Sequence, residues 1–278
     1  MSERLPTSSP FFLDTANGAR FCIFHPPAPG LALRGGLVYL HPFAEEMNCS
    51  RRIAAVQARR LAALGFGVLQ IDLGGCGDSA GEFSDASWDL WRGDGAAAVA
   101  WLREHCSDRI SLWGLRLGGL LALDLASHLT APAEHLLLWQ PVLNGRKFLT
   151  QFLRVALAGQ ARGGAAGFKD TDAMRAALAA GQMLEIGGYE LRPAMASVLE
   201  GLDATLMPAP AARVGWLEVA AGAASMPAAV QQLMDQWRGQ GARVDVQMVD
   251  GAPFWSIPGH AAALPLMRAG ELLLAESA

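Results

Sequence analysis

Short continuous runs of apolar residues recur along the chain, separated by longer segments in which apolar residues follow a helical spacing. Six such runs lie at residues 36–40, 67–72, 109–113, 134–141, 213–219 and 243–249. Runs of this length are typical of strands that are buried on both faces of a parallel sheet. Before them, residues 11–13 and 20–24 flank the turn signal Asn17-Gly18, which predicts a hairpin at one edge of the sheet.

The segments between the runs predict helices. Apolar residues from Ile53 to Leu64 have helical spacing, and we expect Ser50 to cap this helix and Gly65 to end it. Further helices are expected from Ser84 or Asp85 to about Cys106, and at 117–129, 227–238 and about 259–276. Strands that alternate with such helices predict an α/β fold whose mostly parallel sheet is covered on both faces.

The alternation is interrupted between residues 142 and 207. This stretch is rich in alanine and glycine, and it contains the pairs Gly163-Gly164 and Gly187-Gly188. An insertion over the mouth of the sheet would have this character. We therefore expect residues 1–141 and 208–278 to form one α/β core and residues 142–207 to form a cap or lid.

Composition narrows the classes of function. Charged residues make up 17% of the chain and apolar residues 52%, with a net charge of −4. No basic stripe is present for nucleic acid, and no apolar run reaches the ~20 residues of a membrane span. The four cysteines are widely spaced without a C-x-x-C pair, so neither a metal site nor a disulfide framework is expected. A cytoplasmic protein without a cofactor is the simplest interpretation, and nothing indicates an oligomeric state.

One turn carries the most specific information. Gly114-Leu-Arg-Leu-Gly118 lies between a predicted buried strand and an apolar helix. This is the setting of the nucleophile elbow G-x-S-x-G, in which a serine is exposed at the top of a sheet. Here the middle residue is Arg116, whose guanidinium carries only donors and cannot act as a nucleophile.

The order of elements resembles the α/β-hydrolase fold over nearly the whole chain. Asp72-Leu-Gly-Gly-Cys-Gly-Asp-Ser79 resembles the loop D-x-R-G-x-G-x-S with Gly74 in place of its arginine, and His41-Pro-Phe43 takes the place of the oxyanion-loop motif. Together with Trp113-Gly-Leu-Arg-Leu-Gly118, Leu138-Trp-Gln-Pro141 and Phe254-Trp255, these motifs resemble the second type of exosortase-associated hydrolase. Those bacterial proteins are encoded beside machinery for exopolysaccharide export and PEP-CTERM protein sorting.

The resemblance implies a hydrolase of an acyl ester or thioester linked to exopolysaccharide or lipid-carrier metabolism. The usual chain order is nucleophile, acid, histidine. Glu218 lies within the strand that the acid should follow, and residues 250–255 offer no histidine after the last strand. His260 comes a few residues late. We therefore expect the standard Ser-His-Asp triad to be degenerate, and the alternative is a pseudo-enzyme that binds an anionic ligand or a protein partner.

Arg116 has two interpretations. At a helix start, beside the backbone of Leu117, its guanidinium would bind a carboxylate, a phosphate or the phosphopantetheine group of an acyl carrier. Alternatively it forms a structural ion pair, with Glu45, Glu46, Asp78 or Glu218 as candidate partners.

The candidate catalytic residues are His41, Cys76 and Ser79. His41 follows a buried strand and would act as a base or donate to a substrate oxygen, or else bond to the loop backbone. Cys76 and Ser79 are nucleophile types near the predicted mouth of the sheet, but they also suit a tightly packed turn.

Two further groups of polar residues each have two interpretations. Glu45 and Glu46, near Arg51 and Arg52, either begin a solvated helix or act as an acid–base pair or as partners of Arg116. Gln140 and Asn144, with Arg146, either line the ligand pocket or anchor the cap.

Overall fold

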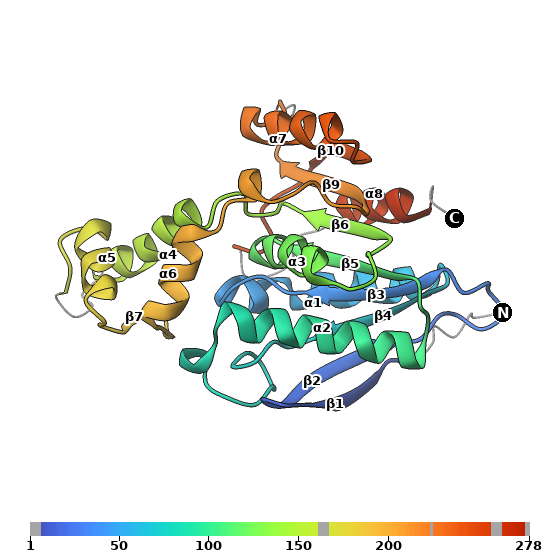
Figure 1. Cartoon of the computed structure of the whole chain (residues 1–278), viewed down its shortest axis with the longest axis horizontal. Coiled ribbons are helices and arrows are strands. Elements are labelled where there is room, and N and C mark those ends of the chain that lie inside the picture. The colour runs from blue at the N-terminus through green and yellow to red at the C-terminus, as the bar shows by residue number, and fades with distance from the viewer. Residues whose placement is uncertain (1–6, 161–166, 223–224, 257–262, 276–278) are drawn as a thin grey trace.

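The computed structural model describes residues 7–160, 167–222, 225–256 and 263–275. Within these residues, eight strands form one sheet in the order β1-β2-β4-β3-β5-β6-β9-β10 (Figure 1). They are β1 (Ser9–Thr15), β2 (Gly18–His25), β3 (Gly35–Leu40), β4 (Phe66–Ile71), β5 (Ile110–Leu115), β6 (His135–Trp139), β9 (Arg213–Ala220) and β10 (Val244–Asp250).

The sheet is parallel except at one edge. β1 and β2 form the expected antiparallel hairpin around Gly18, whose φ of 102° suits a glycine, and β2 also runs antiparallel to β4. All pairings from β4 to β10 are parallel. Parallel strands need crossover connections, and here helices supply them.

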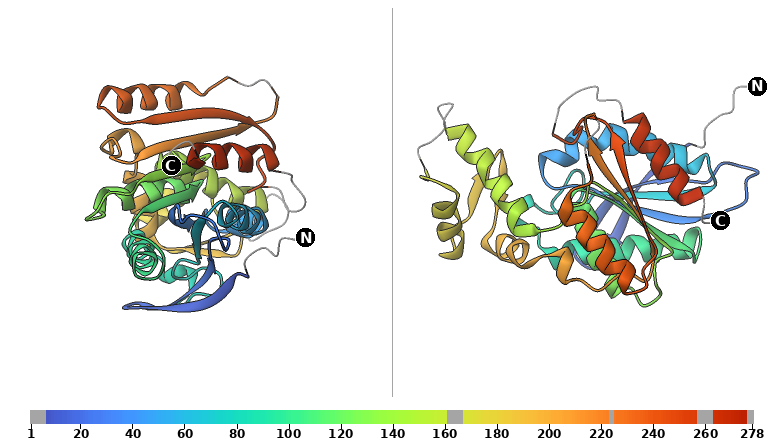
Figure 2. Two further views of the ribbon diagram at one scale, coloured as in Figure 1. Left: turned by 90° about the vertical axis from the view of Figure 1, so that its right-hand side faces the viewer. Right: turned by 90° about the horizontal axis from the view of Figure 1, so that it is seen from above.

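Helices cover both faces of the sheet (Figure 2). Those of the core are α1 (Glu45–Ala62), α2 (Trp88–His105), α3 (Leu117–His128), α7 (Ala228–Gly239) and α8 (Leu264–Ala275). α1 and α8 pack on one face, whereas α2, α3 and α7 pack on the other. No helix in the described ranges is long and apolar enough to cross a membrane.

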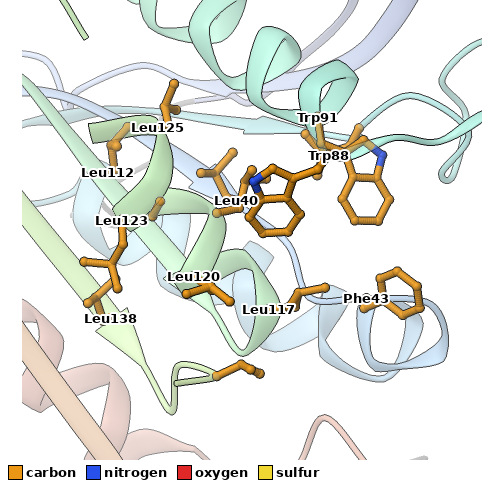
Figure 3. Packing of buried hydrophobic residues seen from close by; sticks show 14 of the residues in the cluster. Leu40, Phe43, Trp88, Trp91, Leu112, Leu117, Leu120, Leu123, Leu125 and Leu138 are labelled. Atoms are coloured by element: carbon orange, nitrogen blue, oxygen red, sulfur yellow. The ribbon is translucent and has the colours of Figure 1, made fainter. Parts of the chain in front are cut away.

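The sheet divides the core into two clusters because alternate residues of a strand point to opposite faces. In β3, Leu37 and Tyr39 contribute to the cluster under α1 and α8, while Val38 and Leu40 contribute to the other. Figure 3 shows part of the larger cluster, where side chains of β3, β5, β6, α2 and α3 come together.

Two predicted helix starts are wrong. α1 begins at Glu45 rather than after Ser50, whose hydroxyl instead donates to the carbonyl of Glu46 inside the helix. A short 3₁₀ helix, η1 (Phe83–Asp85), occupies the second predicted start. α2 then begins at Trp88, with the Ser87 hydroxyl accepting from Leu90 N at 3.1 Å.

The chain between β6 and β9 forms a separate group of elements that projects from the sheet (Figure 1). It contains α4 (Gly145–Gln160), α5 (Thr171–Ala179), β7 (Leu184–Ile186), β8 (Tyr189–Leu191), α6 (Pro193–Gly201) and η2 (Ala204–Leu206). β7 and β8 form a two-stranded hairpin of their own. We call residues 142–207 the cap, and its buried residues are continuous with the larger core cluster.

A buried ion pair explains Gly74. Arg20 Nε lies 2.8 Å from Asp94 Oδ1, and both side chains are almost fully buried. The other carboxylate oxygen of Asp94 accepts from Gly74 N at 2.7 Å. A Cβ atom on residue 74 would lie 2.9 Å from Arg20 Nη2, so Arg20 fills the space that a side chain there would need.

Candidate functional site

The turn after β5 holds Arg116 in an unusual backbone conformation. Arg116 has φ 56° and ψ −119°, a region that non-glycine residues rarely adopt. Its N–H donates to Trp139 O at 3.0 Å, and its carbonyl accepts from Gly119 N and Val142 N. These bonds hold the residue at the junction of β5 and α3, where the elbow places its nucleophile.

The flanking glycines allow strand and helix to approach closely. A Cβ atom on Gly114 would lie 2.4 Å from Gly118 O, and one on Gly118 would lie 2.2 Å from Leu40 O. Real side chains do not tolerate such distances. The close packing of strand and helix therefore requires glycine at both ends of this turn.

A cavity of about 490 Å³ lies beside this turn, which is within the usual range for small-molecule sites. The start of α1, the elbow, the loop after β10 and the cap line it. Its lining is mostly apolar and consists of Phe43, Ala44, Glu45, Glu46, Cys49, Arg116, Phe148, Gln151, Phe152, Val155, Ile186, Gly187, Tyr189, Trp255 and Ser256.

The guanidinium of Arg116 has incomplete bonding. Its Nε lies 3.3 Å from Glu46 Oε1, and its Nη1 donates to Gln140 O at a long 3.5 Å. The indole of Trp255 lies against it, 5.4 Å from ring centre to Cζ, a cation–π contact. Across the described ranges no acceptor bonds to Nη2. Arg116 therefore retains donor capacity toward a cavity that it lines.

Glu46 is a poorly satisfied partner of Arg116. Its Oε2 is buried and has no hydrogen-bond partner among the described residues. Burial raises the pKa of Glu46, and the nearby charge and hydrogen bond of Arg116 only partly oppose that effect. The ion pair is made through a single N···O contact, and each partner keeps at least one polar atom without a hydrogen bond among the described residues.

Glu218 does not bond to Arg116. It accepts from Trp216 Nε1 at 2.7 Å and from Gln140 Nε2 at 2.8 Å, and burial raises its pKa. The side-chain oxygen of Gln140 accepts from Val219 N. This network ties the end of β6 to β9 and fixes the Gln140 carbonyl beside Arg116.

His41 lies outside the cavity lining. Its Nδ1 donates to Pro42 O at 2.8 Å and its Nε2 accepts from Leu73 N at 3.1 Å, which joins the loops after β3 and β4. Burial lowers the pKa of His41. Both ring nitrogens are thus engaged with backbone groups in a neutral imidazole.

Cys76 and Ser79 are also buried away from the cavity lining. Burial raises the pKa of the Cys76 thiol to about 12, which disfavours a thiolate. The Ser79 hydroxyl donates to Asp72 O and accepts from Phe21 N at 2.9 Å. Both residues contribute to the packing and bonding of a tight loop.

The remaining predicted residues lie at the cavity, in the cap or elsewhere in the α/β core. Glu45 lines the cavity and accepts from Tyr189 OH at 3.0 Å. Asn144 donates to Asp203 Oδ2 at 2.8 Å, within the cap.

Leu117 is buried at the start of α3. Arg51 pairs with Asp72, Arg52 is exposed, and the carbonyl of Arg146 accepts from Arg175 in the cap.

Several lining residues were not expected from the sequence. Phe148, Phe152 and Val155 on α4 follow a helical spacing that could have marked one apolar face. Cys49 and Ser256 are the nucleophile-type side chains of the described lining, and Cys49 has a raised pKa through burial and the nearby Glu45 and Glu46. No histidine of the described residues lines the cavity, and His260 lies outside those residues.

No family model matches the sequence, and no curated protein matches it. Many solved structures share the fold. Est1E from Butyrivibrio proteoclasticus, solved with ferulic acid, is 14% identical with a TM-score of 0.68, covering 96% of this chain and 98% of that one. An α/β serine hydrolase without a lid from Xanthomonas campestris is 18% identical, with a TM-score of 0.58 and coverage of 97% and 94%.

A third similar structure, an α-β serine hydrolase homologue from Coxiella burnetii, is 16% identical, with a TM-score of 0.55 and coverage of 97% of both chains. The likeness covers nearly the whole chain in each case. Together with the mostly parallel sheet, it confirms the predicted α/β-hydrolase fold.

Proposed function

We propose that this protein, which has the α/β-hydrolase fold, binds an anionic ligand at Arg116 and does not hydrolyse it. The observation that supports this most directly is the guanidinium itself: it stands at the elbow, lines the cavity and has an unbonded Nη2 among the described residues. The start of α3 adds the partial positive charge of a helix N-terminus.

The surroundings of the cavity favour binding over turnover. The elbow carries a side chain that cannot attack a carbonyl. His41 and Ser79 use their polar atoms within the loops, and burial disfavours the Cys76 thiolate. A pseudo-enzyme with a degenerate triad accounts for all of these features.

Hydrolysis of an acyl ester or thioester is the second candidate. It is favoured by the position of the cavity at the elbow and by the structural likeness to serine hydrolases. The resemblance to exosortase-associated hydrolases would connect such a substrate with exopolysaccharide metabolism. On this alternative, His41, Cys76 and Ser79 remain the predicted catalytic residues.

Two measurements distinguish the candidates. Short p-nitrophenyl esters and acyl thioesters should show neither a burst nor turnover. Anilinonaphthalene sulfonate, a fluorescent organic anion, should bind the wild-type protein, and Arg116→Leu should abolish that binding. Arg154→Leu, at an exposed arginine of α4 outside the lining, is the matched control and should bind normally. Turnover that disappears in Cys76→Ala or His41→Ala would instead establish the hydrolase.

A further inference from the structure

The cavity lining also bears on the chemical class of the ligand. We propose that the ligand is a monocarboxylic acid with an unbranched apolar chain, whose carboxylate binds Arg116 and whose chain lies along α4 of the cap. This inference rests on the proposed function and adds the ligand's headgroup and shape to it.

The local charge favours a group with a single negative charge. Arg116 is the only basic side chain in the described lining, which also contains the acidic residues Glu45 and Glu46. A phosphate dianion would meet one cation and two acidic groups, whereas a carboxylate meets less repulsion. Glu46 already brings a carboxylate to Nε, so a second one can bind at the Nη2 side of the same planar group.

Most of the lining away from Arg116 is apolar, with Gln151, Tyr189 and Ser256 as polar exceptions. Phe43 makes edge contacts with Phe148 and Phe152, with ring centres 5.6 and 5.0 Å apart. Ile186 of β7 adds an aliphatic surface to the same cavity. Such walls would stabilise a hydrocarbon chain by burial and offer few partners to a sugar or a peptide.

α4 gives the cavity a direction. Phe148 is 7% exposed, Phe152 is half-buried and Val155 is 52% exposed. The lining therefore runs from a buried end to an open end over seven residues of helix, a length of ~10 Å. In this proposal the carboxylate binds Arg116, and the chain follows α4 and leaves the cavity past Val155, the exposed end of this lining.

Isothermal titration of the whole protein with acetate, octanoate, octanol and octyl phosphate tests the proposal. Octanoate should bind at least about a hundredfold more tightly than acetate, because each buried methylene adds to the affinity. It should also bind more tightly than octanol and octyl phosphate. Val155→Trp should narrow the open end of the cavity and weaken the binding of octanoate at least about tenfold.

Val198→Trp is the matched control, because Val198 is an exposed valine of the cap outside the cavity lining. It should bind octanoate as the wild type does. Equal affinity for acetate and octanoate would overturn the proposed binding of the apolar chain but not the binding of an anion. The same would follow if Val155→Trp bound octanoate as tightly as the wild type. If octyl phosphate bound more tightly than octanoate, the carboxylate headgroup would be wrong. It would also be wrong if octanol bound as tightly as octanoate. If octanoate does not bind while anilinonaphthalene sulfonate still requires Arg116, the ligand class is wrong and the proposed function stands.

Discussion

At the scale of single residues, Arg116 and Glu46 form a pair in which the protein's own carboxylate already contacts the guanidinium that we propose as the anion site. The contact is long, at 3.3 Å, and Glu46 Oε2 has no bonding partner among the described residues. An anion bound at the Nη2 side of the guanidinium would therefore lie close to the charge of Glu46 and be repelled by it. This repulsion makes the proposed binding sensitive to the protonation of one side chain.

The pKa of Glu46 is raised by burial, so this carboxyl takes up a proton at a higher pH than an exposed glutamate does. As the pH falls through that raised pKa, Glu46 loses its charge and its hold on Arg116 weakens. Binding of anilinonaphthalene sulfonate, whose sulfonate stays ionised, should then tighten. At neutral pH, Glu46→Gln should bind it about tenfold more tightly than the wild type and with little pH dependence.

Glu45→Gln serves as the control, because Glu45 bonds to Tyr189 and Asn48 rather than to Arg116. It should keep the pH dependence of the wild type. Fluorescence titrations at several pH values measure all three proteins. Binding that weakens on acidification would contradict this role of Glu46.

Arg20 and Asp94 provide a prediction about stability. Asp94→Ala would leave a fully buried guanidinium without its partner, so the free energy of unfolding should fall by about 3–5 kcal/mol. Asp89→Ala removes a carboxylate that is 83% exposed and paired with Arg92, and it should cost less than about 1 kcal/mol. Urea denaturation compares the two. Equal losses would show that burial does not decide the value of these ion pairs.

At the scale of elements, the glycines of the elbow have a different role from a glycine in a helix. Gly118→Ala would force a Cβ atom against Leu40 O, so stability should fall by at least about 1–3 kcal/mol. Gly93 of α2 faces open space, and Gly93→Ala should raise stability by about 0.5–1 kcal/mol. Thermal unfolding of both variants measures whether each substitution raises or lowers stability. A stabilising Gly118→Ala would contradict the close packing of the turn.

The strands could be predicted from the sequence because each is a short apolar run with both faces buried. β3 and β5, for example, begin and end within two residues of the expected positions. Helix starts were harder to predict. Ala44, with φ 51° and no side-chain bond, caps α1 without any recognisable capping residue, and Ser50 offered a plausible but wrong cap. Tertiary packing of the loop after β3 overrides the local preference there.

At the scale of the whole molecule, alternation of strands and helices was sufficient to predict the fold, but the cavity depended on contacts between distant segments. Glu46 was among the predicted partners of Arg116. The aromatic walls were not foreseen, since Phe148, Tyr189 and Trp255 come from the cap and the loop after β10. Their approach to the elbow depends on how these parts pack, which periodicity along one segment does not reveal.

The backbone conformation of the elbow does not depend on the ligand that we propose. Arg116 keeps φ 56° although it is not a serine, and its conformation is fixed by backbone bonds and neighbouring glycines rather than by its own side chain. Residue 116 is thus a position at which a thiol, an imidazole or an unnatural side chain could be introduced by substitution. The surrounding backbone would hold the new side chain in the place of Arg116.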